Sequence, residues 1–213
     1  MGTTAQKLAY LQETKELFID ALSDLLTGFI VFDASKETLR NLATKYVLGS
    51  NRSNIPKGAF SNCEGIVSVI IPDSVTMIGN ESFALCTGLT SVTIGNSVTR
   101  IGYDAFYRCS VLTSVAVGNG VTSIGFDAFK FCSGLSSITL PDSITSIESG
   151  AFSGCSGLTS VTLTALIPPT LGSSAFSNTN NCPIYVPAES VDAYKLATNW
   201  SEYASRIQAI PQE

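Results

Sequence analysis

Phenylalanine recurs every 23 residues through the middle of the chain, at positions 60, 83, 106, 129 and 152. A cysteine follows each of them three residues later, at positions 63, 86, 109, 132 and 155. Five further apolar positions repeat with the same spacing. A unit of this length is too short to bury its own apolar side, so it must stack on copies of itself. The sequence therefore predicts a solenoid with one continuous core.

Residues 89–101 show the pattern expected within each unit. Leu89, Val92 and Ile94 have the L-x-x-L-x-L spacing, and polar residues alternate with the last two. This period of two predicts a short strand, aligned in parallel with its copies in neighbouring units. Gly, Pro and Asp after each strand predict a turn. We expect a second short strand within residues 98–101 and a tight helical or 3-10 turn that points Phe106 and Cys109 inward.

The unit reads A-F-x-x-C-x-x-L-x-S-V-x-I-P-x-S-V-x-x-I-G, most clearly over residues 151–161. It resembles the BspA-like, Treponema-type leucine-rich repeats of bacterial proteins, and the resemblance covers about residues 59–165. Departures are small: Gly95 and Gly118 replace the usual Pro, and Ser82 replaces Ala. The resemblance implies a leucine-rich-repeat solenoid. Members of this family are typically surface or secreted bacterial proteins, so it also implies a non-catalytic module that binds a protein partner in adhesion or host interaction.

Three segments follow from this pattern. Residues 1–49 differ in composition and predict a helical N-terminal segment, whose second helix carries Leu39, Leu42 and Tyr46. This segment is either a cap on the first unit or a separate module for attachment or oligomerisation through residues 1–48. Residues 50–165 hold five repeats. Residues 166–213 form a degenerate sixth repeat and a mixed α/β C-terminal cap, with a strand at 184–186, a short helix after Ser190, and large apolar residues that close the core. Those apolar residues are Trp200, Tyr203, Ile207 and Ile210.

Composition excludes several functions. The chain has no histidine, which removes imidazole bases and His-ligated metals, and it has no C-x-x-C motif, so we expect no metal site and no cofactor. A net charge of -5 argues against nucleic acid. Asp104 and Asp127 fall about 5 Å apart in adjacent units, a spacing that retaining glycosidases also use. The repeat places them on a solvated ridge without a pocket, so we expect no enzyme.

Targeting signals are missing from the sequence. Residues 1–11 contain no uninterrupted apolar stretch of the kind that a signal peptide needs. The most apolar stretch, residues 17–32, carries Asp20 and Asp24 and is too short to span a bilayer, so we expect no membrane insertion. A cell-surface or secreted location therefore rests on the family resemblance alone.

The cysteines share one slot of the repeat, which predicts a ladder of free, buried thiols. A coil spacing of about 5 Å also satisfies the separation that a disulfide requires, so disulfides between adjacent coils stay open as an alternative. Cys182 falls outside the ladder, and we expect it to be partly exposed.

Two adjacent units carry aromatic and basic residues at matched positions that should point outward. The pairs are Tyr103 with Phe126, Tyr107 with Lys130, and Arg108 with Phe131. Tyr and Arg are common anchors of protein interfaces, so these six residues are the predicted partner-binding surface. Ordinary surface variation is the competing interpretation. The alternative function is a structural spacer or display module of a larger surface or virion assembly. A glycan-binding module is a weaker, third hypothesis, because the strand face carries Ser and Thr without an aromatic platform.

Overall fold

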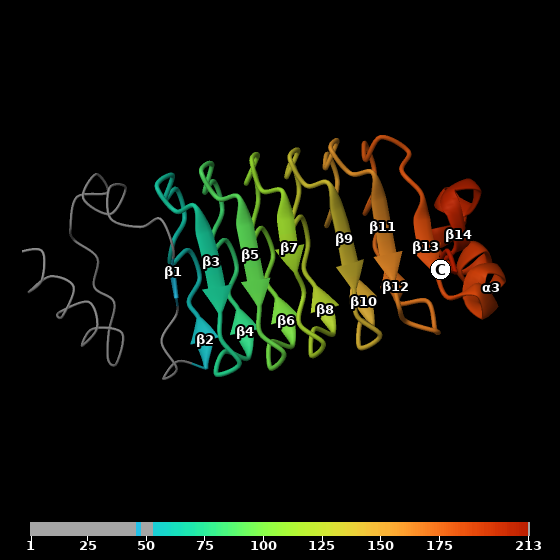
Figure 1. Cartoon of the computed structure of the whole chain (residues 1–213), viewed down its shortest axis with the longest axis horizontal. Helices are drawn as coiled ribbons and strands as arrows, with labels where there is room; N and C mark the ends of the chain where they lie inside the picture. Colours follow the sequence, from blue (N-terminus) through green and yellow to red (C-terminus); the bar gives the residue numbers. More distant parts are fainter. Residues whose placement is uncertain (1–45, 48–52, 213) are drawn as a thin grey trace, which may run out of the picture. The chain divides into compact units, whose positions relative to one another are not determined.

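The computed structural model describes residues 46–47 and 53–212. Over residues 53–212 it shows the expected leucine-rich-repeat solenoid, and the strands of successive coils lie side by side (Figure 1). We number the coils one to six after the phenylalanines that they contain, at positions 60, 83, 106, 129, 152 and 176. The helices predicted within residues 1–45 lie outside the described residues.

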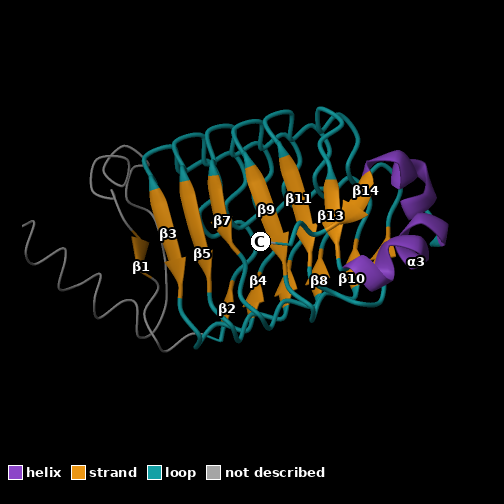
Figure 2. Cartoon of the chain, turned by 45° about the vertical axis from the view of Figure 1, so that its right-hand side comes forward, coloured by secondary structure: helices purple, strands orange, loops and turns teal. Residues whose placement is uncertain are grey.

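Eight strands line one side of the core: one before the first coil, one in each of the six coils and one in the C-terminal segment (Figure 2). These strands are β1 (Tyr46–Val47), β3 (Ser68–Ile71), β5 (Ser91–Ile94), β7 (Ser114–Ala116), β9 (Ser137–Leu140), β11 (Ser160–Leu163), β13 (Ile184–Val186) and β14 (Ile207–Ala209). They form two parallel sheets, in the orders β1-β3-β5-β7 and β14-β13-β11-β9. Paired residues are one repeat apart, as in Val92 opposite Val115. The ladder is therefore interrupted between β7 and β9.

The opposite side of the core carries shorter strands in one uninterrupted parallel sheet. They are β2 (Asn54–Ile55), β4 (Met77–Ile78), β6 (Arg100–Ile101), β8 (Ser123–Ile124), β10 (Ser146–Ile147) and β12 (Thr170–Leu171). In each, the second residue is buried. Coils three and four thus stay paired on this side, through β6 and β8, and β8 pairs in turn with β10.

Phenylalanine rings form the centre of the core. Neighbouring rings from Phe60 to Phe176 stack with centroids 5.1–5.4 Å apart and planes within 10° of parallel. Each coil therefore buries its ring against the rings before and after it, which is why the sequence keeps the 23-residue spacing so strictly. In coil six an insertion moves Phe176 one residue further along the chain without breaking the stack.

The turn that brings Phe and Cys inward is a series of i to i+3 hydrogen bonds and not a helix. In coil three, the N–H groups of Tyr107 and Cys109 donate to the carbonyls of Asp104 and Phe106, at 3.1 and 3.2 Å. Two residues of this turn, Asp104 and Arg108, adopt positive φ angles of 50° and 56°. Left-handed residues prevent a regular helix, because a helix needs successive right-handed residues.

Hydroxyl groups explain the high Ser and Thr content of the chain. The hydroxyl of Thr99 donates to the Thr76 carbonyl one coil earlier, and Thr122 and Thr145 continue the series at 3.0 Å each. A second series runs through Thr90, Thr113, Ser136 and Thr159. The polar residues of the repeat therefore cross-link the coils as well as facing solvent.

The C-terminal segment covers the last coil with a 3-10 helix η1 (Ala188–Ser190), an α-helix α3 (Val191–Leu196) and a second 3-10 helix η2 (Trp200–Arg206). The Trp200 ring lies 5.9 Å from Phe176 and continues the aromatic stack, and its indole N–H donates to the Pro169 carbonyl at 2.8 Å. The Tyr194 hydroxyl donates to the Ala165 carbonyl at 2.9 Å. Both rings are fully buried, so their polar atoms need these partners.

Two local predictions are wrong, and the predicted burial of the thiol ladder fails at its first member, because Cys63 in coil one is only half-buried. Tyr46 lies in strand β1, which pairs in parallel with β3, and not in a helix. A strand at this point supplies hydrogen-bond partners for the backbone groups at the edge of the first coil. Cys182 is buried, with 4% of its surface exposed, because Arg206 covers it: the guanidinium donates to the Cys182 carbonyl at 2.8 Å and to its sulfur at 3.4 Å.

Candidate functional site

The six residues predicted to bind a partner lie on the turns of coils three and four. Phe126 and Phe131 are exposed by 49% and 39%, Arg108 is exposed, and the other three are half-buried. They point outward because Phe106, Phe129 and their neighbouring cysteines occupy the inward positions of the same turns. We refer to Tyr103, Tyr107, Arg108, Phe126, Lys130 and Phe131 as the turn patch.

Three members of the turn patch form one cluster. The Arg108 guanidinium lies 5.4 Å from the ring centroids of both Tyr107 and Phe131. Its Nε donates to the Tyr107 hydroxyl at 3.0 Å, and the two rings meet edge to face at 6.0 Å. Cation–π contacts and the hydrogen bond hold the guanidinium in place, so little side-chain freedom is left to lose on binding.

Lys130 joins the cluster with its charge already neutralised. Its ammonium lies 5.7 Å from the Phe131 ring and 2.7 Å from the Asp127 carboxylate, which is 6% exposed. The hydrogen bond to Asp127 is the main reason that the pKa of Lys130 is raised. Among the described residues, Arg108 makes no ion pair, so it is the cation of this cluster that is open to a partner's carboxylate.

The structure separates Tyr103 from this cluster. The Tyr103 hydroxyl donates to the Glu81 carboxylate at 2.5 Å, and the Lys57 ammonium lies 5.8 Å from its ring. Lys57 and Glu81 are 3.3 Å apart. The Tyr103 hydrogen bond, aided by Lys57, lowers the pKa of Glu81. Tyr103 therefore faces coil two, although it occupies the same slot of the repeat as Phe126 in coil four.

The acidic row beside the turn patch is formed by Glu81, Asp104 and Asp127 in successive coils. Burial, followed by the charges of Asp127 and Glu81, raises the pKa of Asp104. Asp127 forms an ion pair with Lys130. The two aspartates thus lie beside the turn patch.

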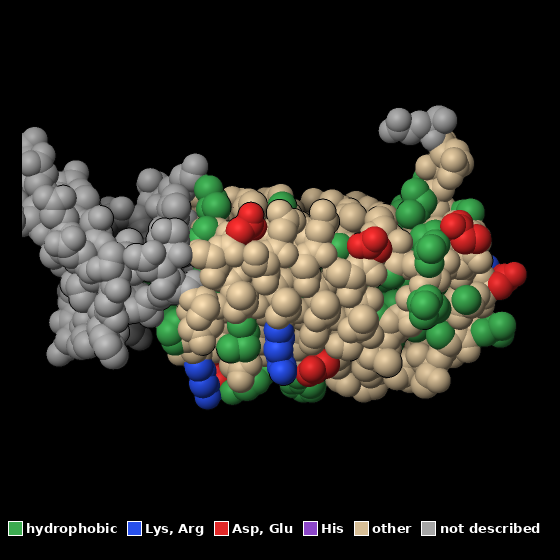
Figure 3. All heavy atoms as spheres, turned by 90° about the horizontal axis from the view of Figure 1, so that it is seen from below, with side chains coloured by type: hydrophobic (Ala, Val, Ile, Leu, Met, Phe, Trp, Pro, Cys, Tyr) green, Lys and Arg blue, Asp and Glu red, His purple; other side chains and the backbone are tan. Residues whose placement is uncertain are grey.

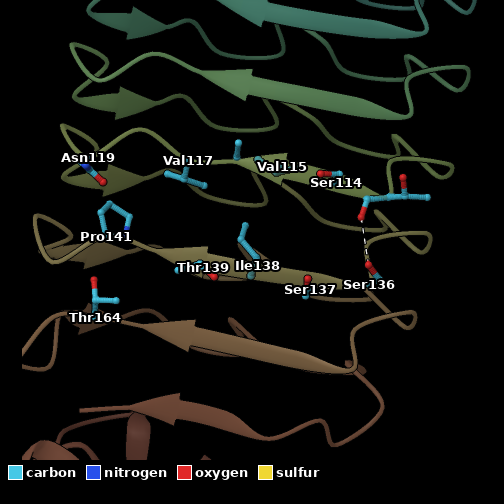
Figure 4. Close-up of a pocket in the computed structure, with 12 residues that line it drawn as sticks. Ser114, Val115, Val117, Asn119, Ser136, Ser137, Ile138, Thr139, Pro141 and Thr164 are labelled. Atoms are coloured by element: carbon cyan, nitrogen blue, oxygen red, sulfur yellow. Dashed lines mark hydrogen bonds between the residues drawn. The ribbon is translucent and has the colours of Figure 1, made fainter. Parts of the chain in front are cut away.

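A groove that sequence reasoning missed lies on the strand face, at the break between β7 and β9. Its volume is about 460 Å³, and Figure 4 shows its lining side chains on the two separated strands. Its walls include Ser114, Val117, Ser137, Thr139 and Pro141. Charged and aromatic side chains do not contribute to the lining.

Apolar side chains also gather at the end of the solenoid that carries α3 (Figure 3). The most exposed are Leu166, Ile167 and Leu196, at 58%, 81% and 84%. They lie in the insertion before β12 and at the end of α3, outside the regular repeat.

Neither a membrane span nor a metal centre is found in the part of the chain that the structure describes. Its helices are too short and too polar to cross a bilayer. Its cysteine and carboxylate side chains do not gather in threes, as an ion site would need. The six cysteines all lie within residues 53–212, and none of them forms a disulfide, as the ladder predicts.

Solved structures of bacterial leucine-rich-repeat proteins resemble this fold. A Treponema pallidum leucine-rich-repeat protein aligns with a TM-score of 0.61 at 26% identity, over 78% of this chain and 86% of that one. A leucine-rich-repeat protein from Bacteroides ovatus aligns with a TM-score of 0.64 at 26% identity, over 79% of this chain and 42% of its own. A leucine-rich cell surface protein from Faecalibacterium prausnitzii gives 0.52 at 28% identity, over 67% and 47%.

The chain therefore spans less than half the length of the last two of these proteins. No curated protein matches the sequence. The model of the BspA type leucine rich repeat region matches residues 53–185 in six copies, which is more than half of the chain. With its stacked coils and parallel strands, the chain belongs to the BspA-type leucine-rich-repeat family.

Proposed function

We propose that the repeat region is a non-catalytic recognition module that binds a protein partner through the turn patch, at the bacterial cell surface. The observation that carries this proposal is the Arg108 guanidinium held between Tyr107 and Phe131, without a carboxylate of its own. A preformed cation flanked by exposed rings suits an acidic side chain set in an apolar surround on a partner. The similarity to a leucine-rich cell surface protein supports the location.

Solvent exposure supports the same surface. Phe126 and Phe131 are among the few large apolar side chains exposed within the regular coils. Exposed aromatic groups cost solubility, so their clustering with a cation favours a contact surface over random surface variation. The Phe126 backbone is fixed as well, since its N–H donates to the Glu148 carboxylate at 3.0 Å.

The test begins with a binding screen of the chain against purified extracellular matrix proteins and a glycan array. We expect a protein to bind. The variant Arg108→Asn plus Phe126→Ser should weaken that binding at least about tenfold. Both replacements occur at the same slot elsewhere in the chain, as Asn62 and Ser149, and Asn tolerates the left-handed φ of position 108. The melting temperature should therefore stay unchanged.

The matched control places two charges on the strand face, as Ser114→Arg plus Thr139→Arg. If this control lost protein binding while the turn-patch variant kept it, the contact surface would lie on the strands. A screen in which glycans bind and proteins do not would replace the proposal with a glycan-binding module. A chain that binds neither and forms an oligomer that disappears on deletion of residues 1–48 would indicate a structural spacer.

A further inference from the structure

A shallow pocket lies beside Phe126, on the side of the solenoid that carries the short strands. Its volume is about 330 Å³, which is at the small end of the range for small-molecule sites. Phe126 contributes to the lining and is 49% exposed. The polar part of the lining comes from coils five and six, through Ser146, Glu148, Ser149 and Thr170, and Gly172 lies beside them. The pocket therefore combines an aromatic ring, a carboxylate and several hydroxyl groups.

Glu148 is an exception to the repeat at this point. The same slot holds glycine in coils two, three, four and six, at positions 79, 102, 125 and 172. In all five coils the N–H of this residue donates to an isoleucine carbonyl of the preceding coil, as from Glu148 to Ile124 at 2.9 Å. A Cβ atom on Gly172 would lie 2.1 Å from the Ser149 nitrogen, so that junction has no room for a side chain. Among coils two to six, only coil five places a side chain in this slot.

Both carboxylate oxygens of Glu148 have a partner. Oε2 accepts the Phe126 N–H at 3.0 Å, and Oε1 lies 4.0 Å from the Arg100 guanidinium. The side chains of Arg100 and Glu148 are nevertheless 53% and 43% exposed. Each oxygen keeps a lone pair for a ligand, and the guanidinium keeps free N–H donors. A charge-balanced donor and acceptor thus lie next to the exposed ring.

The residues that follow Phe126 in its own slot are small. They are Ser149 in coil five and Ser173 in coil six, and the Ser173 hydroxyl donates to that of Ser149 at 3.3 Å. The Thr170 hydroxyl donates to the Thr145 carbonyl at 3.2 Å, which leaves its lone pairs able to accept. Small residues therefore leave room beside the ring, and their hydroxyl groups border that room.

The lining matches a ligand with one apolar face and a rim of hydroxyl groups. The Phe126 ring offers an apolar surface for the C–H groups of such a face. Each ligand hydroxyl both donates and accepts, so one can pair with Arg100 and its neighbour with Glu148. A cationic ligand would be repelled by Arg100 and an anionic ligand by Glu148, so the balanced pair favours a neutral ligand.

We propose that the pocket beside Phe126 binds a neutral pyranose sugar, as one residue of a glycan. The sugar ring lies on Phe126, and its hydroxyl groups bind Glu148 and Arg100. The hydroxyls of Ser146 and Thr170 are further partners. The site goes beyond the protein-binding role of the turn patch. It shares Phe126 with the turn patch but does not use Arg108 or the two rings beside it.

NMR titration of the isotope-labelled chain tests the site, with the methyl glycosides of glucose, galactose, mannose and N-acetylglucosamine as probes. We expect at least one to bind with a Kd of roughly 1 mM, which is within reach of a ligand of this size. Its binding should shift the amide signals of Phe126, Ser149 and Gly172, and leave those of Gly79 and Gly102 unchanged. Acetyl-lysine methylamide, which keeps its side-chain ammonium, is the cationic probe and should bind at least about tenfold more weakly.

Two variants remove the proposed contacts. Glu148→Gly restores the residue found in the other coils, and Phe126→Ser uses the serine of coil five. Each should weaken sugar binding at least about tenfold. Glu148→Gln keeps the shape of the side chain and should weaken binding about threefold, because an amide accepts a weaker hydrogen bond than a carboxylate. The control Glu81→Gly removes a carboxylate from coil two, at a φ of 56° that suits glycine, and should leave sugar binding unchanged.

Three results would overturn the site. They are the absence of binding by all four glycosides, tighter binding of the lysine probe than of any glycoside, and sugar binding that survives both Glu148→Gly and Phe126→Ser. Because the probes are single sugars, these results do not bear on a protein partner bound through Arg108, which is measured separately with the turn-patch variant.

Discussion

The thiol of Cys132 donates a hydrogen bond to the carbonyl oxygen of Phe106 in the preceding coil, with 3.1 Å between sulfur and oxygen. The same carbonyl accepts the N–H of Cys109 at 3.2 Å, so the thiol occupies its second lone pair. The relationship repeats in the pairs Cys86–Phe60, Cys109–Phe83 and Cys155–Phe129. The cysteine of the repeat therefore both packs in the core and bonds one coil to the coil before it, which a purely apolar residue cannot do.

These thiols should be inert in the folded protein. Burial raises the pKa of Cys109 to about 12, and burial likewise raises the pKa of Cys86 and Cys132. At pH 9 we expect iodoacetamide to leave Cys86, Cys109, Cys132 and Cys155 unmodified, and to modify all of them after denaturation without reductant. Mass spectrometry of the alkylated chain counts the modified cysteines in the folded and in the denatured protein. Fewer than two free thiols after denaturation would mean that the ladder forms disulfides.

The raised thiol pKa values also predict alkaline destabilisation. Unfolded thiols ionise at their ordinary pKa near 9, whereas the buried ones stay protonated up to their higher folded pKa. Stability is therefore fully present below pH 9 and is lost as the pH rises, by at most about 1.4 kcal/mol per pH unit for each buried thiol. Urea unfolding between pH 8 and 11 measures the loss. The triple variant Cys86→Ala, Cys109→Ala and Cys132→Ala should show a smaller decline, and an identical decline would contradict the assignment.

Phe106→Ala should destabilise the chain by about 3–5 kcal/mol, because it removes a fully buried ring stacked on both sides, at 5.2 and 5.1 Å. Phe126→Ala is the matched control, since Phe126 lies in the next coil and is 49% exposed. Its effect should stay within about 0.5 kcal/mol. Thermal and urea unfolding of the two variants give the comparison. Similar losses for both would be incompatible with the stacked core.

The threonine series should contribute measurably to stability. Thr122→Val removes the hydroxyl that donates to the Thr99 carbonyl at 3.0 Å, and we expect a loss of about 0.5–1 kcal/mol. Thr139→Val is the control, because the Thr139 hydroxyl makes no hydrogen bond within residues 53–212 and valine suits a strand equally well. Urea unfolding at pH 7 distinguishes the two. If Thr122→Val left the free energy of unfolding unchanged, the threonine hydrogen bonds would be a consequence of coil stacking and would not stabilise it.

Asp104→Asn should stabilise the chain at neutral pH. Burial and the neighbouring carboxylates raise the pKa of Asp104 above its ordinary 3.8, so the ionised carboxylate disfavours the folded state. This cost is present above the folded pKa and disappears as the pH falls below 3.8. Asparagine tolerates the φ of 50° and carries no charge. We expect a gain of roughly a few tenths of a kcal/mol at pH 7, reduced by solvent screening, and none near pH 3. An equal gain at pH 3 and pH 7 would show that it does not come from the Asp104 charge.

The turn patch shows which features of a surface can be predicted from the repeat register and which cannot. The repeat register correctly predicted that Tyr107, Arg108 and Phe131 face outward, because the inward slots were already assigned to Phe and Cys. It did not predict that Arg108 lies between the two rings or that Tyr103 turns to Glu81, since side-chain direction depends on left-handed residues within the turn. Those conformations result from the stacking of neighbouring turns, whose N–H and C=O groups bond from coil to coil.

The sequence by itself determined the solenoid, because a 23-residue unit with fixed apolar slots has only its own copies to pack against. It also determined the parallel strands and the stacked Phe and Cys ladders, which follow from that spacing. The junctions between particular coils were decided by the tertiary structure. β7 and β9 do not pair, although they follow the same repeat as β9 and β11, which do. Pairing depends on how two backbones 23 residues apart meet in the folded chain, and the groove lies at the junction where they fail to pair.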